Sequence, residues 1–436
     1  MPSVLIDGFN LGLEKGTGVA TYARNLSYEL KELGFEVDVL YGNRGGTSPD
    51  SLLREIEFFD NQSGSGGSGI QQALRGGNIL RIPFGLKRAE VPITGKVVAQ
   101  AFDERLPRFD RIYNCPDGFY RGHLNFSLRK KFSTVRLPRQ PDIAHWTYPL
   151  PVRVKNIPNI YTLHDIVPLR LPYTTLDNKK NYHALIRTIG RQADHVVTVS
   201  ECSKRDLVEI AGISPDRITN TYQSVSIPAK YRDKPEDQVA REVEGAAGVG
   251  YKEYYLFWGA IEPKKNVGRM IEAYLASKVD VPLVIVGAKA WKSEGELNLL
   301  DSNANFARAV DKDVLSTRKV ILLNYLPFSL LVSMIRGARA ALFPSLYEGF
   351  GLPALEAMAL GTPVICSNTS SLPEIVGDAA VLVDPYDPGA ISAAIRHVDA
   401  DEDLRADLRQ RGLAQAEEFA PCKYRERLRE LYDRLI

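Results

Sequence analysis

Cysteine is scarce in this 436-residue sequence, long apolar runs are absent, and the net charge is small. The four cysteines, Cys115, Cys202, Cys366 and Cys422, lie far apart without a C-x-x-C pair, which excludes a zinc ribbon and favours reduced, packed thiols. No segment approaches the roughly 18 apolar residues that a membrane-spanning helix needs. The first residues lack the basic and apolar regions of a signal peptide. We therefore expect a cytoplasmic protein, with the inner face of the plasma membrane as the alternative location.

The balance of charge argues against a general role in binding polyanions. The sequence has 55 basic and 53 acidic residues, which gives a formal net charge of +2. Proteins that bind nucleic acid through their overall charge carry a larger basic excess. We therefore expect no nucleic-acid partner, and any basic surface that matters has to be local.

Short apolar, β-branched segments alternate with helical patterns along most of the chain. In the first half the predicted strands are residues 4–6, 37–41, 143–145, 160–163 and 196–199. In the second half they are residues 254–258, 283–286, 320–323, 340–343, 364–366 and 380–383. This alternation is typical of parallel sheets joined by right-handed crossovers, and the chain is longer than one hydrophobic core normally organises. The predicted fold is α/β, with two Rossmann-like domains that face each other across a cleft.

Prolines mark the predicted boundaries between domains. Pro228 and Pro235 lie in a charged, weakly apolar segment that is typical of a linker. Pro421 interrupts a helical pattern near the end of the chain, so the final helix is redirected and can cross back to the first domain. The predicted units are residues 1–228, residues 249–415 and a returning C-terminal helix, 416–436.

The segment 344–361, PSLYEGFGLPALEAMALG, contains the most informative motif of the sequence. A predicted strand runs into a glycine-rich turn and then into a helix, an arrangement in which backbone N–H groups and the helix dipole favour anions. Glu348 stands on the loop at the end of the strand, where ligands of open α/β sheets bind. Glu356 lies about one turn into an otherwise apolar helix, and a carboxylate there needs a partner. Ribose hydroxyls would meet that need.

Glu348 and Glu356 form an E-x7-E pair, and the run EGFGLPALEAMALGTPVI resembles the signature of glycosyltransferase family 4, a retaining family with the GT-B fold. The resemblance implies that Glu348 contacts hydroxyls of the donor sugar and that Glu356 binds the ribose of the nucleotide. The backbone of Phe350, Gly351 and Leu352 would line the sugar and the phosphate. The alternative is a capped helix with a surface glutamate and an incidental core glutamate.

Two further loops of the second half fit the same resemblance. In LFWGAIEPKKNV, Lys264 and Lys265 occupy the loop that neutralises the donor diphosphate in the family, although the arginine frequent after the glycine is Ala260 here. Asn324 and Tyr325 follow the strand 320–323, where relatives pass the nucleobase, and they are candidates for contacts to the base. The alternatives are a solvated pair of lysines and a tyrosine that only packs.

In the first half, Gly16 and Gly18 precede a predicted helix and resemble the glycine-rich segment that faces the donor phosphates and the acceptor in the family. As a dinucleotide fingerprint the segment is poor, because Thr21 takes the third glycine position. His164 follows the strand 160–163, and the resemblance implies that it contacts the donor sugar, with Asp165 orienting it or capping the turn. Both features also have a purely structural explanation. The glycine segment would be a plain loop that enters a helix, and His164 would be a hydrogen-bonded residue at the end of a strand.

The sequence predicts neither an essential metal nor another cofactor. Asp311 and Asp313, and Asp399 and Asp401, each form a D-x-D pair, the pattern of the other large glycosyltransferase fold. Neither pair follows a predicted strand with further acidic or histidine support, and residues 399–403 are better explained as acidic residues at a helix start.

The resulting hypothesis is a retaining transfer of a hexosyl group, with His164, Glu348 and Lys265 as the catalytic residues. The resemblance is closest to bacterial mannosyltransferases of polysaccharide assembly, so GDP-mannose is the first candidate donor, with UDP-glucose and other donors open, and a saccharide is the acceptor. The rival hypotheses are a nucleotide-sugar epimerase of similar two-domain fold, a nicotinamide-dependent oxidoreductase that uses Gly16 and Gly18, and a non-catalytic, lectin-like scaffold.

Residues 118–139 form the local basic feature of the chain. Six basic residues are interleaved with four aromatic ones, and no acidic residue interrupts them. Such a segment can dock on an anionic leaflet, or it can hold the diphosphate of a lipid-linked acceptor. The alternative is a surface loop that acidic neighbours balance in space.

Overall fold

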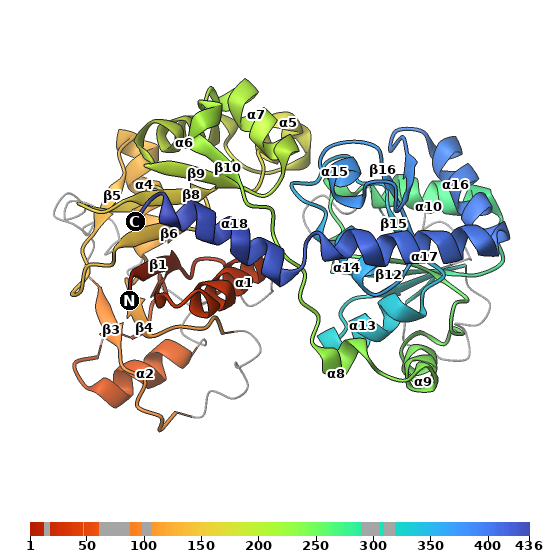
Figure 1. Ribbon diagram of the computed structural model, residues 1–436, viewed down its shortest axis with the longest axis horizontal. Helices are drawn as coiled ribbons and strands as arrows, with labels where there is room; N and C mark the ends of the chain where they lie inside the picture. The colour runs from red at the N-terminus through yellow and green to blue at the C-terminus, as the bar shows by residue number, and fades with distance from the viewer. Residues whose placement is uncertain are drawn as a thin grey trace.

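The computed structural model describes residues 1–12, 18–46, 48–60, 88–97, 106–288, 296, 306–308 and 319–436. Two lobes lie side by side, and the chain termini are both on the N-terminal lobe (Figure 1). Gly16, Asp311 and Asp313 lie outside the described residues. None of the helices in the described ranges combines the length and the apolar character that crossing a bilayer requires.

The N-terminal lobe is built on a sheet with the strand order β10-β9-β8-β6-β1-β2-β4-β3. All neighbouring strands are parallel except the edge strand β3, which runs antiparallel to β4. The strands are β1 (Ser3–Asp7), β2 (Glu36–Tyr41), β3 (Ala89–Val91), β4 (Arg111–Asn114), β6 (Ile143–Trp146), β8 (Asn159–Thr162), β9 (His195–Thr198) and β10 (Ile218–Asn220). A small parallel pair, β5 (Ser133–Val135) and β7 (Val152–Val154), lies beside it.

The helices of this lobe connect the parallel strands. They are α1 (Gly18–Glu32), α2 (Ser51–Phe59), α4 (Gly118–Arg129), α5 (Val167–Arg170), α6 (Lys179–Gln192) and α7 (Glu201–Ala211), with 3-10 turns η4 (Pro172–Thr174) and η5 (Pro215–Arg217). Crossover helices between parallel strands place the carboxyl ends of β1, β6 and β8 at one edge of the sheet. The loops after these strands are therefore the ones that can form a site.

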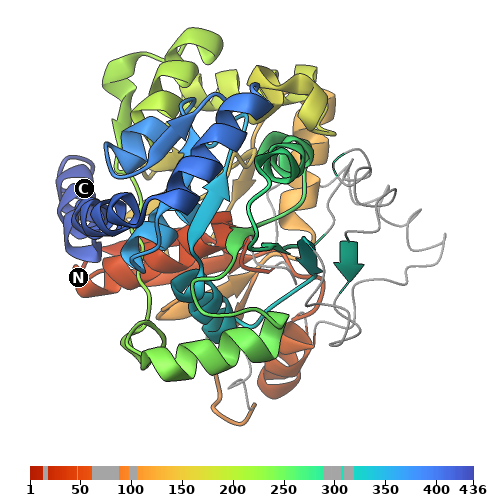
Figure 2. The same cartoon turned by 90° about the vertical axis from the view of Figure 1, so that its right-hand side faces the viewer.

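The C-terminal lobe contains a parallel sheet in the order β13-β14-β12-β11-β15-β16-β17. Its strands are β11 (Tyr255–Trp258), β12 (Leu283–Val286), β13 (Phe306–Arg308), β14 (Val320–Leu323), β15 (Ala340–Phe343), β16 (Val364–Ser367) and β17 (Val381–Val383). Helices cover both faces of this sheet (Figure 2). They are α8 (Ala229–Arg232), α9 (Glu236–Ala247), α10 (Val267–Ser277), α13 (Phe328–Gly337), α14 (Leu352–Ala359), α15 (Leu372–Val376), α16 (Pro388–Ala400) and α17 (Glu402–Glu417), with the 3-10 turn η6 (Pro263–Lys265).

The interval between the two predicted domains is helical rather than a plain linker. Val239, Val243 and Ala247 recur at helical spacing and are buried in α9, which packs against α13 of the C-terminal lobe. The polar and charged residues that suggested a linker lie on the other face of this short amphipathic helix.

The last helix, α18 (Pro421–Asp433), belongs to the N-terminal lobe although it follows α17 of the C-terminal lobe. It lies against α1, where Arg425 pairs with Glu29 at 2.8 Å. Pro421 stands in its first turn, where the missing N–H is harmless. Leu428 and Leu431 are fully buried.

The chain passes between the lobes twice, and the two passages lie together. Phe419, between α17 and α18, contacts the ring of Tyr222 at 5.4 Å, and its carbonyl accepts a hydrogen bond from the Val225 amide at 3.4 Å. The same Phe419 ring contacts Phe350 at 5.7 Å. The connecting segments therefore touch the glycine-rich loop of the E-x7-E motif.

A buried polar network fastens α18 to the first sheet. His145 lies 2.6 Å from the Tyr432 hydroxyl through Nδ1 and 2.7 Å from the Thr162 hydroxyl through Nε2. The Tyr22 hydroxyl of α1 lies 2.9 Å from the same Thr162 oxygen. Burial lowers the pKa of His145 to about 3, so its ring is neutral and has one donor and one acceptor nitrogen.

Removing one hydroxyl of this network tests its contribution to stability. We expect Tyr432→Phe to lower the free energy of unfolding by about 1–3 kcal/mol, because it leaves a buried ring nitrogen without its partner. Urea unfolding of both proteins measures the difference, and Tyr120→Phe on the surface is the control. A loss no larger than that of the control would show that the network does not hold α18.

Candidate functional site

Glu348 and Lys265 form a buried ion pair at the carboxyl edge of the second sheet. Lys265 lies in η6 after β11, Glu348 lies in the loop after β15, and β11 and β15 are neighbouring strands. The Lys265 Nζ lies 2.6 Å from Glu348 Oε1, with side chains only 13% and 9% exposed. The Ser345 hydroxyl donates to the same oxygen at 2.8 Å. Burial alone would raise the pKa of Glu348, but the charges of Lys265 and Lys264 hold it below its usual value, so the carboxylate is ionised.

Lys264 adds a second positive charge beside this pair. Its Nζ lies 3.5 Å from Glu262 Oε1. Burial would lower the pKa of Lys264, but the carboxylates of Asp165, Glu262 and Glu348 raise it well above its usual value. Asp165 comes from the N-terminal lobe, so acidic groups of both lobes keep this lysine charged.

The backbone of residues 348–351 is held in place by serine hydroxyls. Ser371 Oγ lies 2.9 and 2.8 Å from the carbonyl oxygens of Glu348 and Phe350. Ser200 and Ser203 of the N-terminal lobe lie 2.7 and 3.2 Å from the Gly349 carbonyl. In a trans peptide the N–H points away from the C=O, so the amides that follow these carbonyls face away from the serines. These amides belong to Gly349, Phe350 and Gly351, which lead into α14, and the N-terminus of such a helix favours an anion.

Glycine is required at two places of this loop. Gly351 has φ of +103°, and a Cβ there would lie 2.8 Å from Leu372. A Cβ on Gly349 would lie 2.8 Å from the His164 carbonyl oxygen and 3.0 Å from Asp165 Oδ2. The N-terminal lobe therefore approaches the loop next to Glu348 as closely as backbone atoms allow.

Glu356 lies in α14 with a single hydrogen-bond partner among the described side chains. The indole N–H of Trp258, at the end of β11, donates to its Oε2 at 3.1 Å. Burial raises the pKa of Glu356 to about 7, and the indole bond offsets only part of that effect. The sequence predicted that this carboxylate needs a partner, and among the described residues Trp258 is the one side chain that supplies a hydrogen bond.

His164 lies at the carboxyl edge of the first sheet, against the loop that carries Glu348. Its Nε2 lies 3.0 Å from the Thr147 carbonyl, so Nε2 carries the proton and Nδ1 is left as an acceptor. The Tyr22 ring meets it edge-on at 4.7 Å. Burial lowers its pKa, which keeps the ring neutral. Thr147 is itself held by Asp7, which accepts from its backbone N–H and from its hydroxyl, the latter at 2.9 Å.

Two contacts between the lobes were not predicted from the sequence. Glu374 of α15 accepts hydrogen bonds from the backbone N–H groups of Glu201 and Cys202 at 2.7 and 3.1 Å, and so caps α7 of the other lobe. Tyr347 donates to Asp206 at 2.5 Å, and Arg170 binds the other oxygen of that carboxylate at 2.8 Å. The contacts of Glu374 and Tyr347 join residues more than 140 positions apart, and no local pattern marks such partners.

The remaining predicted residues do not join this cluster. Asn324 and Tyr325 are exposed after β14, with Tyr325 73% exposed. Gly18 begins α1, and no atom lies within 4 Å of the place a Cβ would take. Leu352 is the first residue of α14 and is half-buried. Asp399 pairs with Arg339 at 2.6 Å and Asp401 caps α17, so these two have structural partners. Within the described ranges, no group of three metal-ligating side chains is found.

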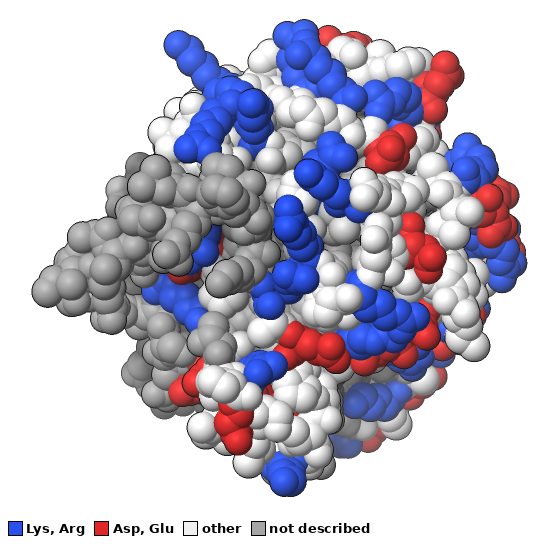
Figure 3. Space-filling view, turned by 90° about the vertical axis from the view of Figure 1, so that its left-hand side faces the viewer, with Lys and Arg blue, Asp and Glu red and all other residues white. Residues whose placement is uncertain are grey.

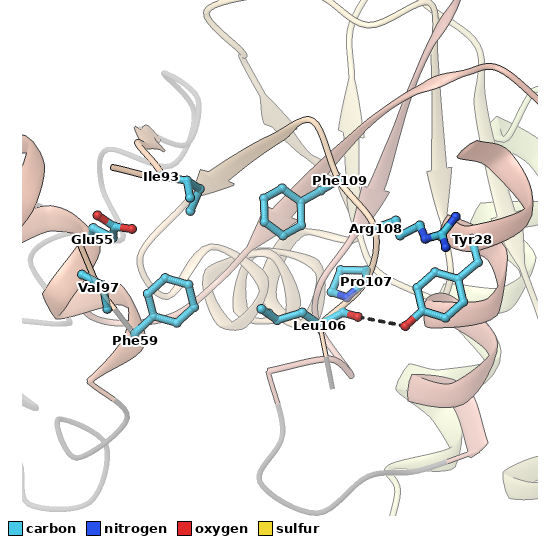
Figure 4. A pocket seen from close by; sticks show the side chains of 9 residues that line it. All are labelled: Tyr28, Glu55, Phe59, Ile93, Val97, Leu106, Pro107, Arg108 and Phe109. Atoms are coloured by element: carbon cyan, nitrogen blue, oxygen red, sulfur yellow. Dashed lines mark hydrogen bonds between the residues drawn. The ribbon is translucent and has the colours of Figure 1, made fainter. Parts of the chain in front are cut away.

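A cavity of about 530 Å³ lies elsewhere, in the N-terminal lobe. Its wall is formed by side chains of α1 and α2, by Ile93 and Val97 and by residues 106–109, and at one end the Tyr28 hydroxyl donates to the Leu106 carbonyl at 3.3 Å (Figure 4). Glu55 in this wall is bound by Thr94, and Arg108 pairs with Glu32 at 2.8 Å. None of the predicted site residues lines it, so we place the site at the Glu348–Lys265 pair and not in this cavity.

Comparisons with known families match both halves of the chain. A family described as "Glycosyl transferases group 1" matches residues 246–415, and "Glycosyltransferase Family 4" matches residues 96–226. The first region contains the second sheet, and the second contains β4 to β10 of the first sheet.

The chain is similar to several bacterial proteins. It is 32% identical to O-antigen chain mannosyltransferase B of Escherichia coli over 60% of this chain and 66% of that protein. It is 27% identical to the MMP alpha-(1->4)-mannosyltransferase of Mycolicibacterium hassiacum over 89% and 87% of the two chains. Its match to the serotype-specific mannosyltransferase WbdA of Escherichia coli spans only 33% of that longer protein. Among solved structures, Anabaena HepE in complex with UDP and glucose superposes with a TM-score of 0.67 over both whole chains at 14% identity, which shows the same fold.

Proposed function

This chain belongs to glycosyltransferase family 4, and from that premise we propose that it moves mannose, with retention, from a nucleoside diphosphate sugar to a saccharide acceptor. GDP-mannose is the proposed donor, and a lipid-linked saccharide of surface polysaccharide assembly is the proposed acceptor. The mannosyltransferase names of the relatives support the choice of sugar. The four free thiols support a reducing, cytoplasmic location.

The observation that carries the proposal is the Glu348–Lys265 pair, whose Glu348 lies in the loop that leads into α14, where Gly349 lies against the His164 carbonyl. The ionised Glu348 can accept hydrogen bonds from sugar hydroxyls, and the carboxylate stays fixed through Lys265 and Ser345. A neutral His164 offers Nδ1 on the opposite lobe. The donor sugar would therefore be held from both lobes at once.

Charge stabilisation is the main catalytic contribution of these residues. Transfer breaks the bond between the anomeric carbon and the diphosphate oxygen and forms a bond to the acceptor oxygen, and the acceptor proton passes to the departing diphosphate. Negative charge therefore builds on the diphosphate in the transition state. Lys264, Lys265 and the N-terminal amides of α14 are fixed beside that position and stabilise it without reorganisation. These cations take the part that a metal ion plays elsewhere, so we propose that the enzyme needs no metal and no other cofactor.

The nucleotide would lie along α14 toward Glu356. The carboxylate of Glu356 has one oxygen engaged by Trp258, which leaves the other oxygen available for the proposed contact to the ribose hydroxyls. Asn324 and Tyr325 remain the proposed contacts to the base, because both are exposed at the carboxyl end of β14 in the same sheet.

A panel of donors tests the proposal. We expect GDP-mannose at a concentration 100 times its Kd to stabilise the protein against unfolding by about 2.7 kcal/mol, and UDP-glucose at the same concentration to stabilise it less. We expect Glu348→Gln to keep the stabilisation that GDP alone provides and to lose the increment due to the sugar. Thermal unfolding with GDP, UDP and both donors measures this, with the exposed Glu32→Gln as the control. Equal increments in wild type and Glu348→Gln would remove Glu348 from the sugar site.

A further inference from the structure

The outer face of α4 carries exposed apolar side chains on a basic surface. Phe119, Gly122 and Phe126 are buried and fix the inner face of the helix. The opposite face carries Tyr120 and Leu128, which are 60% and 64% exposed, with the half-buried Leu124 between them at helical spacing. Exposed apolar side chains that line up along a helix mark a surface that contacts something other than water.

The surroundings of this helix are strongly basic. Residues 118–192 contain thirteen Lys and Arg residues but only three Asp and no Glu, in a chain whose net charge is +2. Arg129, Lys130 and Lys131 follow directly after Leu128 and are all exposed. Lys130 lies 2.6 Å from Asn181, which places α6 with Lys179 and Lys180 beside the end of α4. Lys and Arg side chains spread over the upper part of the outer face of this lobe, with few Asp or Glu between them (Figure 3).

The basic charge of this surface is not neutralised by carboxylates of the described residues. Arg139 pairs with Glu36, and Arg170 pairs with Asp206 and Glu209, but those two lie at the margins. Arg129, Lys130, Lys131 and Lys180 have no carboxylate partner within the described ranges. Residues 61–87, outside those ranges, contain no Asp or Glu either. The alternative for residues 118–139 was a surface loop whose positive charge is neutralised by acidic side chains nearby in space. The described residues do not support this alternative.

The same helix is connected to the proposed active site by aromatic contacts. Phe119 of α4 meets Phe9, after β1, edge-on at 5.6 Å, and Phe9 stacks on Tyr148, after β6, at 5.4 Å. Tyr148 interacts electrostatically with Asp165 and Lys264 beside the Glu348–Lys265 pair. The N-terminal turn of α4 is therefore next to the region where an acceptor would enter.

We propose that the outer face of α4, with Arg129, Lys130 and Lys131 at its end, rests on an anionic lipid bilayer. Tyr120 and Leu128 would enter the boundary between headgroups and acyl chains, and the three basic side chains would contact anionic headgroups. The exposed apolar side chains along α4 favour a lipid surface over a nucleic acid. A nucleic acid would contact the basic side chains but would leave the leucines in water. The inference goes beyond the transfer reaction, and it explains how a lipid-linked acceptor reaches the site.

Binding to lipid vesicles tests this surface with the full-length protein. We expect partitioning onto vesicles of phosphatidylglycerol and phosphatidylcholine, little onto pure phosphatidylcholine, and a decline as salt increases. Each basic residue near the surface contributes about fivefold to the partition coefficient, so the triple variant Arg129→Gln, Lys130→Gln and Lys131→Gln should lose about a hundredfold. Leu128→Ser should weaken binding without changing its dependence on salt.

A matched variant removes the same charge from helices of the C-terminal lobe. Arg232, Arg241 and Arg396 are exposed outside the N-terminal lobe, and the triple change to Gln there should leave partitioning within about twofold, because only a local charge excess attracts the bilayer. Equal losses in both triple variants would overturn the proposal, and so would binding of an RNA oligonucleotide in place of vesicles. Stabilisation of the protein by the donor in thermal unfolding is measured alongside vesicle binding. The α4 variants should leave this stabilisation unchanged. Because vesicle binding is a separate measurement, an error in the donor assignment would not affect the test of the lipid surface.

Discussion

Replacing Lys265 with alanine is expected to lower turnover by about 10²–10³-fold, because one fixed cation beside the departing diphosphate is lost. The same change leaves Glu348 buried without its 2.6 Å partner. Breaking a buried ion pair by removing one member costs about 3–5 kcal/mol. Initial rates with GDP-mannose and urea unfolding of the empty protein measure the two effects separately.

A double variant distinguishes the catalytic role of this pair from its contribution to stability. Lys265→Met with Glu348→Gln keeps the shape of both side chains and removes both charges, so stability should return to within about 1 kcal/mol of wild type. Activity should stay lost. The exposed pair of Lys31 and Asp110 serves as the control, and Lys31→Ala should cost about 0–1 kcal/mol with full activity. Recovery of activity in the double variant would show that the charge of Lys265 is not used in the reaction.

The second large effect is a pH dependence that comes from Glu356. The pKa of its carboxyl is about 7 in the empty protein, and only the ionised form can accept hydrogen bonds from two ribose hydroxyls. Affinity for GDP should therefore fall about tenfold for each pH unit below 7. Glu356→Gln should weaken GDP binding at pH 8 by about 10–100-fold and remove the pH dependence centred near 7, so that only protonation of the terminal phosphate of GDP, with a pKa of about 6, still affects binding. Calorimetric titration from about pH 5.5 to 8.5 measures both.

The same substitution should affect stability in the opposite direction. A carboxyl whose pKa is raised on folding stabilises the protein below its unfolded pKa, and this contribution is lost as the pH rises through about 7. At pH 8 the ionised Glu356 therefore costs up to about 3 kcal/mol, and Glu356→Gln should be more stable than wild type there and equal to it at pH 4. Trp258→Phe removes the indole N–H that stabilises the ionised Glu356, so the midpoint of the pH dependence of GDP affinity should move above pH 7. A midpoint that persists in Glu356→Gln would assign the titration to another group.

Much of the architecture could be predicted from the sequence because fully buried parallel strands consist of short runs of apolar residues. The predicted segments 283–286, 320–323 and 340–343 coincide with β12, β14 and β15. Strands without that pattern were missed. The edge strand β3 has only Val91 buried, and β4 has only Ile112 and Tyr113 between the polar residues Arg111 and Asn114. The helix α9 was missed because its three buried residues are too few to dominate a charged segment.

The site was predictable where one local segment contains its chemistry. Glu348, Gly349, Gly351 and Glu356 lie within nine residues, and the strand–turn–helix that they form follows from their order. Their partners come from elsewhere in the chain. Ser200 and Ser203, Glu374 and Trp258 are unremarkable residues in their own surroundings, and only the approach of the two lobes gives them a function. Tertiary contacts of this kind leave no periodicity to detect.

The position of Phe419 limits how the two lobes can move. Both passages of the chain between the lobes lie at this residue, which contacts Tyr222 and the Val225 amide. Two connections that run close together act as a hinge with a single axis, whereas one connection would be a free joint. Phe350, next to the anion-binding turn, touches the same ring. The loop of the E-x7-E motif is thus mounted beside this hinge, and we expect any opening that releases the proposed nucleotide product to be a rotation about a point close to that loop.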